Sequence, residues 1–361
     1  MILTYKYRIK DRSAKKTLRR HAYAVNQVWN YCCAQQRDTE ARYRAGAPRR
    51  KWASHFDLQK LCKGVGAELG LHQQSVGGVC RDFAKARDKV KHAPRFRSSF
   101  GSKRALGWVP FKGQSRQVNS NTITYLGKRY RFWEGNRPLP ENAKGGCFVE
   151  DALGRWFVCF HVEIEARVGG NDAIGIDLGL KSLATLSDGR KIEAPKHYRQ
   201  YEQRLAVAQR ANNKQRTRRI HAKIKNCRQD FLHKETTKLH REHALIAVGN
   251  VNSLQLAKTR MAKSVLDAGW STFRSMLRYK SAGYREVDEK FTTQICSECG
   301  SLPPSRPKGI ADLEMRAWDC FDCGASHDRD VNAARNILTL ALSVSSVLLR
   351  KAGEHHATRA S

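Results

Sequence analysis

The chain has 361 residues, of which 67 are lysine or arginine and 33 are aspartate or glutamate, so its formal net charge is +34. A chain this basic repels itself unless it binds a polyanion, which indicates nucleic acid or an anionic membrane as its partner. No uncharged apolar run reaches the roughly 18 residues that a membrane span needs, and we expect no secretory signal. Hydrophobic residues make up 40% of the chain, enough to form packed cores. The composition therefore predicts a folded, soluble, intracellular protein that binds a polyanion.

The first half of the chain predicts a sheet that is interrupted by helices. Residues 2–9 are rich in β-branched and aromatic side chains, as is typical of a strand. After Ser13, apolar residues recur at spacings of four and three, which marks one face of a long helix, and helical sequence continues to about Lys91. Residues 94–165 again have the character of strands. We expect the first strand to join this later sheet, which makes a β-barrel with a helical insertion.

The second half alternates buried strands with helices. A strand ends at Asp177, and Asp188-Gly189 is a strong signal for the hairpin that follows it. Residues 197–243 are helical and very basic, with a break at 211–213 that predicts two antiparallel helices. The remaining predicted elements are a buried strand at 245–250, a helix around Trp270, Phe273 and Leu277, a third strand at 284–289 and a last helix at 331–349.

Two pairs of cysteines form the strongest local signal in the sequence. Two residues lie within each pair and twenty separate the pairs, giving Cys296, Cys299, Cys320 and Cys323. Four thiolates at this spacing are typical of a zinc ribbon, in which a tetrahedral, structural Zn²⁺ lies about 2.3 Å from each sulfur. Two redox-active pairs are the alternative, but the thioredoxin-like context is absent. The other seven cysteines are scattered, and we expect them to be reduced.

Two aspartates form a second constellation. Asp177 ends the first strand of the second half, and Asp330 directly precedes the last predicted helix. Taken alone, Asp330 could be a helix N-cap, and Asp177 could be a turn residue at the end of a strand. Together, with a sheet between them, they describe the arrangement of RNase H-like nucleases, in which carboxylates from different elements hold two Mg²⁺ ions about 3.5–4 Å apart.

Several segments together resemble the TnpB-type RNA-guided nucleases of bacterial transposons, which are relatives of the type V CRISPR effectors. The resemblance covers nearly the whole chain and is most specific in the C-terminal half. The segments that carry it are the basic helical hairpin and residues 5–9, 137–158, 175–189, 256–270, 291–300 and 327–337.

This resemblance implies an α+β, multidomain fold. Its parts are a wedge β-barrel (1–12 and 93–168), a helical recognition insert (13–92), a RuvC-like nuclease domain of RNase H-like α/β fold (169–290 and 325–350, with the basic hairpin at 197–243), a zinc ribbon (291–324) and a disordered tail (351–361). It also implies a guide RNA transcribed from the transposon end, and double-stranded target DNA that is cut beside a short adjacent motif. Such a protein would be cytoplasmic and associated with the bacterial nucleoid.

One departure from the family concerns the catalytic acids. Members usually carry a glutamate at the end of the strand that corresponds to residues 245–248, whereas this chain has Gly249 there. The strand at 284–289 should lie parallel to that strand, about 4.8 Å away, so an acid at its end could reach the vacated position. We therefore predict that Glu289 replaces the missing ligand, with Asp288 and Glu286 as weaker candidates. The alternative is that Glu289 is an ordinary exposed acid.

The missing second acid leaves two other functions open. A chain without the usual second acid could be a nuclease-inactive, RNA-guided repressor that only binds DNA. It could also be a transposition accessory that binds DNA without a guide. The retained Asp177 and Asp330, together with a complete set of zinc ligands, favour an active Mg²⁺-dependent endonuclease, because a binding protein has no need of these acids.

The clustered basic residues predict contacts with phosphates of the guide RNA and the target DNA. Such contacts supply affinity and salt dependence, while sequence is read by guide pairing. The predicted set is Arg49, Arg50, Lys51, Arg204, Arg210, Lys214, Arg216, Arg218, Arg219 and Lys223.

Overall fold

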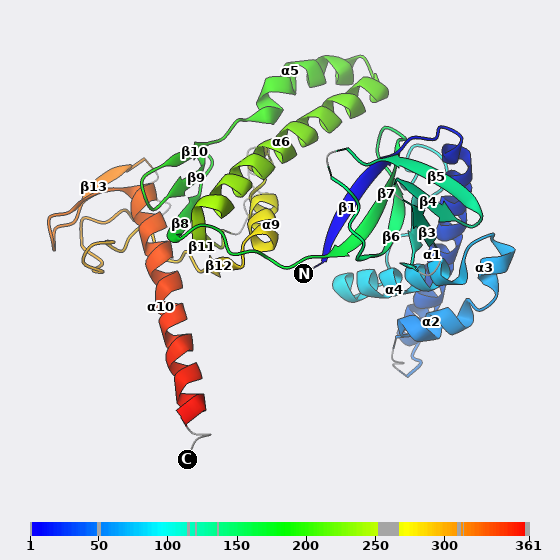
Figure 1. The fold of residues 1–361 in the computed structure, drawn as a ribbon, viewed down its shortest axis with the longest axis horizontal. Helices are drawn as coiled ribbons and strands as arrows, with labels where there is room; N and C mark the ends of the chain where they lie inside the picture. Colours follow the sequence, from blue (N-terminus) through cyan, green and yellow to red (C-terminus); the bar gives the residue numbers. More distant parts are fainter. Residues whose placement is uncertain are drawn as a thin grey trace. The chain divides into compact units, whose positions relative to one another are not determined.

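The computed structural model divides the chain into two compact units, residues 1–164 and 165–361 (Figure 1). It describes residues 2–48, 52–113, 116–119, 121–135, 137–251, 267–308, 312 and 314–357. The predicted phosphate contacts Arg49, Arg50 and Lys51 lie outside these residues. The fold is mixed α+β and multidomain, as predicted.

The first unit is built on a seven-stranded antiparallel sheet with the order β2-β6-β7-β1-β5-β4-β3. The N-terminal strand β1 pairs with β7 along most of its length, which confirms that it joins the later strands. The order is open in the described residues, so the sheet is a half-barrel where the sequence predicts a barrel. The strands are β1 (Ile2–Ile9), β2 (Trp108–Phe111), β3 (Arg116–Asn119), β4 (Thr122–Tyr125), β5 (Lys128–Trp133), β6 (Ala143–Glu150) and β7 (Trp156–Glu163).

In the described part of the segment between β1 and β2 there are four helices, as the helical character of this sequence predicts. They are α1 (Ala14–Arg44), α2 (His55–Leu61), α3 (Val65–Glu68) and α4 (Gln73–Val90). The apolar stripe of α1 is buried and packs in the same hydrophobic core as the inner face of the sheet. This burial orders the helical insertion on the half-barrel.

The second unit contains a five-stranded sheet with the order β10-β9-β8-β11-β12. Strands β8, β11 and β12 are parallel to one another, and β9 is antiparallel to both of its neighbours. The predicted hairpin joins β9 to β10, and the predicted parallel pairing of β11 with β12 is confirmed. The strands are β8 (Asp172–Leu178), β9 (Ser182–Leu186), β10 (Lys191–Glu193), β11 (His243–Gly249) and β12 (Gly283–Val287).

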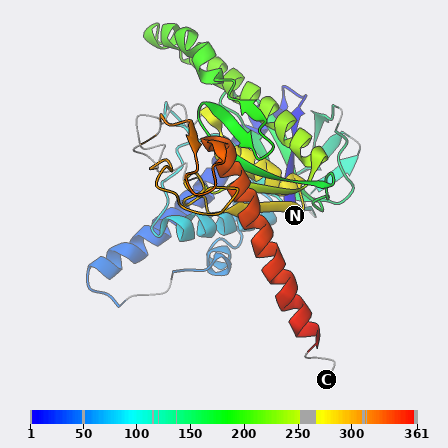
Figure 2. The same cartoon turned by 90° about the vertical axis from the view of Figure 1, so that its left-hand side faces the viewer.

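Helices cover this sheet and extend beyond it (Figure 2). The predicted break in the basic segment separates α5 (His197–Arg210) from α6 (Lys214–Glu242), and α9 (Trp270–Lys280) packs against α6. Helix α10 (Arg329–Ala357) lies against β8 so closely that a Cβ on Gly175 would stand 2.0 Å from the carbonyl oxygen of Ala334. Glycine at this position therefore allows the last helix to approach the strand that carries Asp177.

Two short strands, β13 (Ala317–Asp319) and β14 (Ser326–Asp328), precede α10. Helix α10 begins two residues before the predicted start and ends at Ala357, so residues 351–357 are helical where the sequence predicts a disordered tail. Within the described ranges, no helix is long and apolar enough to cross a membrane.

Candidate zinc centre and carboxylate site

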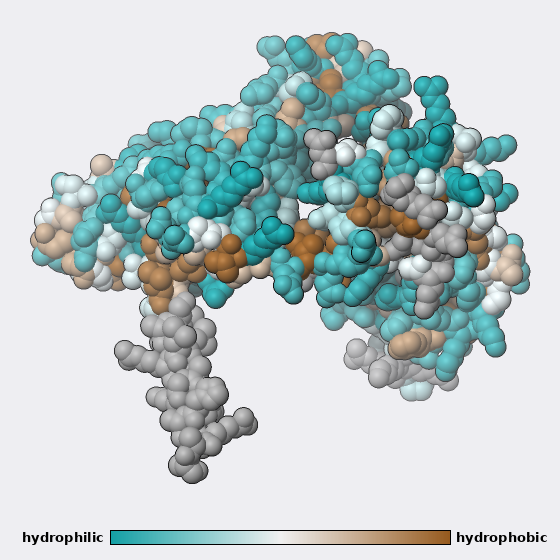
Figure 3. Space-filling model, in the orientation of Figure 1, coloured by the Kyte–Doolittle hydropathy of each residue, from teal (hydrophilic) through white to brown (hydrophobic). Residues whose placement is uncertain are grey.

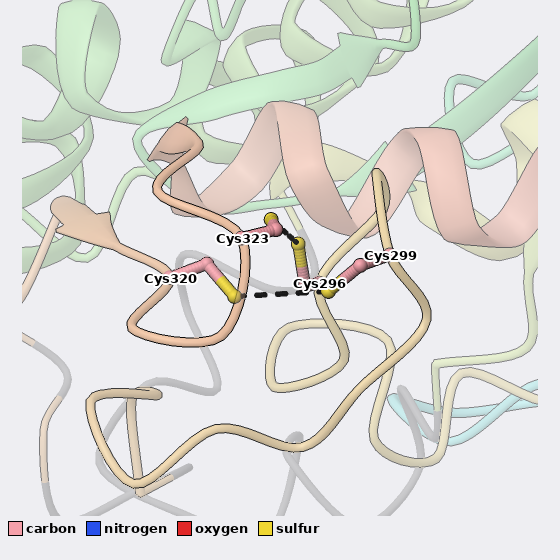
Figure 4. Close-up of side chains that lie close together, drawn as sticks. All are labelled: Cys296, Cys299, Cys320 and Cys323. Carbon is pink, nitrogen blue, oxygen red and sulfur yellow. Dashed lines mark hydrogen bonds between the residues drawn. The ribbon is translucent and has the colours of Figure 1, made fainter.

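The four predicted zinc ligands come together at the two knuckles of the C-terminal unit. The sulfurs of Cys296, Cys299, Cys320 and Cys323 all lie within 4.8 Å of one another. Figure 4 shows that the two knuckles face each other, with 3.7 Å between the sulfurs of Cys296 and Cys323 and 3.8 Å between those of Cys299 and Cys320. Four sulfurs about 2.3 Å from a tetrahedral ion are roughly 3.8 Å apart. The cluster therefore fits Zn²⁺.

A histidine that the sequence analysis did not single out supports the first ligand. His327 is 5% exposed, and its Nε2 lies 3.1 Å from the sulfur of Cys296. Its ring packs against that of Trp318 in a tilted arrangement, with 4.7 Å between the ring centroids. Burial lowers the pKa of His327, which favours the neutral ring. A neutral imidazole with its proton on Nε2 can donate to the thiolate, as outer-shell partners of metal ligands commonly do.

Zinc should bind at one equivalent per chain, and the double variant Cys299→Ser/Cys320→Ser should lose it. Removing two of four thiolates leaves too few ligands for a structural site, so the zinc module should unfold. Elemental analysis of the purified protein measures the metal, and Cys227→Ser, a thiol on α6 outside the cluster, is the control. A full equivalent of zinc retained by the double variant would contradict the assignment.

A second group of sulfurs lies in the first unit. Cys32, Cys62 and Cys80 are fully buried and lie within 4.8 Å of one another, and among the described residues no fourth histidine, cysteine or acid joins them. They belong to the hydrophobic core that includes α1 and α4. Buried thiols of this kind pack as small apolar side chains.

The predicted carboxylates gather at the edge where the parallel strands end. Val248 of β11 pairs with Ile176 of β8, so the next residue, Gly249, lies beside Asp177. On its other side, Gly249 pairs with Val287, the last residue of β12. Because parallel strands end at the same edge of a sheet, Asp177 and the residues that follow Val287 flank one glycine.

Glu289 is the acid that turns toward this glycine. A Cβ built on Gly249 would lie 2.9 Å from Oε2 of Glu289 and 3.2 Å from Cδ1 of Ile337. Asn250 holds the backbone here, because its Oδ1 accepts from the amide of Glu289 at 3.4 Å. The carboxylate of Glu289 thus lies next to the space that a side chain on residue 249 would fill.

The two weaker candidates lie elsewhere. Glu286 forms ion pairs with Arg274 and Arg278 of α9. Asp288 is exposed, and its Oδ1 accepts from the amide of Lys290. Neither contact concerns Gly249.

Asp330 is not the N-cap of the last helix. That role belongs to Asp328, whose Oδ1 accepts from the amides of Asp330 and Val331 at 3.0 Å each. The carboxylate of Asp330 lies in the first turn and contacts Arg316 and Arg329, each at 3.4 Å. The side chain of Asp330 is therefore available for a role other than capping.

Asp177 interacts electrostatically with the two other acids. Burial, and then the charges of Asp330 and Glu289, raise the pKa of Asp177 to about 8. Burial also raises the pKa of Glu289, which the charge of Arg274 partly offsets. Within the described residues the three carboxylates do not meet the 4.8 Å spacing of the four sulfurs. Carboxylate oxygens are the donors that hard divalent cations such as Mg²⁺ prefer.

The basic hairpin of α5 and α6 exposes a long stretch without acidic side chains. Residues 203–229 contain nine lysines and arginines and no aspartate or glutamate. The side chains of the predicted set in this segment are exposed, and Figure 3 shows a mostly hydrophilic surface over the hairpin. They are Arg204, Arg210, Lys214, Arg216, Arg218, Arg219 and Lys223.

Comparisons with known proteins show which families and proteins the chain resembles. Residues 157–260 match the family described as "Probable transposase" (OrfB_IS605), and residues 270–337 match "Cas12f1-like, TNB domain". A Streptomyces pristinaespiralis protein named "Putative RNA-guided DNA endonuclease" is 42% identical over 76% of this chain and 72% of its own. The Escherichia coli K12 protein "Putative RNA-guided DNA endonuclease InsQ" is 27% identical over 91% of this chain and 89% of its own. A solved Cas12f1–sgRNA–target DNA complex covers 94% of this chain and 99% of its own at 14% identity and a TM-score of 0.35.

The extended match to the Streptomyces protein places this chain in the TnpB family of RNA-guided DNA endonucleases, with a four-cysteine zinc-binding cluster in its TNB domain.

Proposed function

We propose that the chain is an active, Mg²⁺-dependent, RNA-guided DNA endonuclease whose catalytic carboxylates are Asp177, Glu289 and Asp330. The observation that carries the proposal is the position of Glu289, whose Oε2 lies 2.9 Å from a Cβ built on Gly249. The carboxylate of Glu289, two residues beyond the end of β12, thus lies next to the position from which the family's usual acid would extend. The charges of Asp330 and Glu289, which both raise the pKa of Asp177, support a shared site.

The topology of the second unit supports an RNase H-like, RuvC-type nuclease domain. Its central strand β8 carries the first acid, the parallel strands β11 and β12 follow on one side, and α10 crosses β8 with the last acid in its first turn. Residues 169–290 and 325–350 would form this domain, with the zinc ribbon 291–324 inserted before the last helix. In the first unit, the half-barrel would be the wedge domain and α1–α4 the recognition insert.

Each residue of the site has a definite task in the proposed reaction. Asp177 and Asp330 would hold ions from the strand and the helix, and Glu289 would supply the third carboxylate from beyond β12. Bound Mg²⁺ makes water a stronger nucleophile and stabilises charge on the leaving oxygen of a phosphodiester. Asn250 would keep the backbone of Glu289 at the strand edge through its hydrogen bond.

The basic hairpin would bind nucleic acid rather than take part in chemistry. Its exposed lysines and arginines can neutralise phosphates of a guide RNA and of the RNA–DNA duplex. In guided nucleases the protein contacts the backbone and base pairing reads the sequence. The proposed partners are therefore a guide RNA from the transposon end and double-stranded target DNA.

The test is cleavage by the protein purified together with its RNA. Sequencing the co-purified RNA gives the guide segment, and DNA that matches this segment, flanked by a randomised region, is the substrate. Cleavage in Mg²⁺ that stops on chelation and depends on the match is expected. Guide-dependent binding without any cutting would instead establish a repressor, and binding that is indifferent to the guide would establish a transposition accessory.

A further inference from the structure

Two asparagines on α10 grip the segment between Glu289 and the zinc site. Asn332 is 1% exposed and Asn336 is 7% exposed, one helical turn apart. The Nδ2 of Asn332 donates to the carbonyls of Thr292 (3.2 Å) and Ile295 (2.7 Å), and that of Asn336 donates to the same two carbonyls at 2.8 and 2.7 Å. The Oδ1 of Asn332 also accepts from the amide of Ser297 at 2.9 Å. We call this pair the asparagine clamp.

The gripped segment leads directly to Glu289 at one end. The carbonyl of Glu289 accepts from both the amide (3.2 Å) and the hydroxyl (2.8 Å) of Thr292, which is itself 2% exposed. The clamp binds the carbonyl of that same Thr292. Glu289 lies beyond the last residue of β12, so these contacts and the hydrogen bond from its amide to Asn250, rather than sheet pairing, hold its backbone.

The segment leads to the zinc site at its other end. Cys296 lies between the two clamped residues Ile295 and Ser297, and its sulfur contacts His327 just before α10. Asp330 stands two residues before Asn332 on the same helix. One rigid helix thus carries one catalytic candidate and holds the loop that carries another.

We propose that Asn332 and Asn336 are positioning residues that set the separation of the Glu289 and Asp330 carboxylates, with the zinc knuckle as the anchor. This inference rests on the proposed function, because it takes these two acids as ligands of the divalent ions. Metal sites lose about 10- to 100-fold in affinity when outer-shell partners that orient the ligands are removed. The clamp is such a partner, although it acts through the backbone of the loop.

The test measures Mn²⁺, a substitute for Mg²⁺, bound to the zinc-loaded protein–RNA complex by the loss of the free-ion EPR signal. The Mn²⁺ bound at the carboxylate site is the difference between the Mn²⁺ bound by the wild type and by Asp177→Ala. Asn332→Ala/Asn336→Ala should weaken this binding about 10- to 100-fold and raise the Mg²⁺ concentration for half-maximal cleavage, while one zinc per chain is retained. Asn336→Leu keeps the side-chain volume and removes two of the five hydrogen bonds of the clamp, so it should weaken Mn²⁺ binding less than the double variant does. If the double variant loses zinc, the Mn²⁺ affinity of Asn336→Leu tests the inference instead.

The control is Thr236→Val, in which the buried Thr236 hydroxyl no longer donates to the carbonyl of Leu232 on the same helix or accepts from Lys280 of α9, and the loop is untouched. It should lower stability and leave Mn²⁺ affinity unchanged. Clamp variants with wild-type Mn²⁺ affinity would overturn the inference while the proposed function stands. If the wild-type protein and Asp177→Ala bind Mn²⁺ equally, both the inference and the proposed function are overturned.

Discussion

Asp177→Ala is expected to lower the DNA cleavage rate by about 10³-fold or more, since a two-ion site that loses a ligand from its central strand cannot place both ions. Asp177 lies on β8 beside Gly249, and the charges of Glu289 and Asp330 both raise its pKa. It is therefore the central acid of the proposed site. Binding to guide RNA and target DNA should be unchanged, because Asp177 lies away from the basic hairpin in sequence and is partly buried. Single-turnover cleavage and a filter-binding assay on the same preparations measure the two quantities.

Asp172→Ala is the matched control for this experiment. Asp172 is an exposed aspartate at the opposite end of the same strand, so its replacement is the same chemical change on β8 and leaves the site intact. If Asp177→Ala cleaves DNA as fast as Asp172→Ala, the carboxylate site does not take part in cleavage. Equal loss of binding in both variants would point to a general effect of charge.

The second unit could be predicted from sequence because its strands are apolar runs with clear ends. The predicted strands that end at Asp177 and that span 245–250 and 284–289 become β8, β11 and β12, and their parallel order brings Glu289 to Gly249. The role of Asp330 could not be settled in this way. Asp328 and Asp330 stand two residues apart, helix starts are uncertain by one or two residues, and only the observed hydrogen bonds assign the cap to Asp328.

Features that depend on distant contacts were outside the reach of the sequence. The sequence shows Asn332 and Asn336 four residues apart on one helix face, but not that the carbonyls of Thr292 and Ile295 lie opposite them. His327 likewise gives no sign of its contact with Cys296 until the two knuckles are folded. The half-barrel differs from the predicted barrel for a similar reason, because closure depends on whether two edge strands meet and not on local periodicity.

The relocation of the second acid is tested by moving it back. Glu289→Ala should reduce cleavage by roughly 10²-fold or more, because it removes a metal ligand. Gly249→Glu/Glu289→Ala should regain at least about tenfold of that loss, since the new carboxylate starts from the strand position beside Asp177 and the clash with Glu289 is gone. Gly249→Glu alone should not raise activity, because its Cβ would lie 2.9 Å from Oε2 of Glu289 and 3.2 Å from Cδ1 of Ile337.

Two further variants separate charge from space in this experiment. Gly249→Gln/Glu289→Ala fills the same volume without a carboxylate and should stay as inactive as Glu289→Ala. Glu286→Ala removes a neighbouring acid that is held by Arg274 and Arg278, and it should cleave at close to the wild-type rate. If Glu289→Ala cleaves as fast as the wild type, Glu289 is an ordinary half-buried acid and the third ligand must be sought elsewhere. If only the glutamate at position 249 restores cleavage, then one carboxylate at this edge of the sheet is what the reaction requires, whichever strand supplies it.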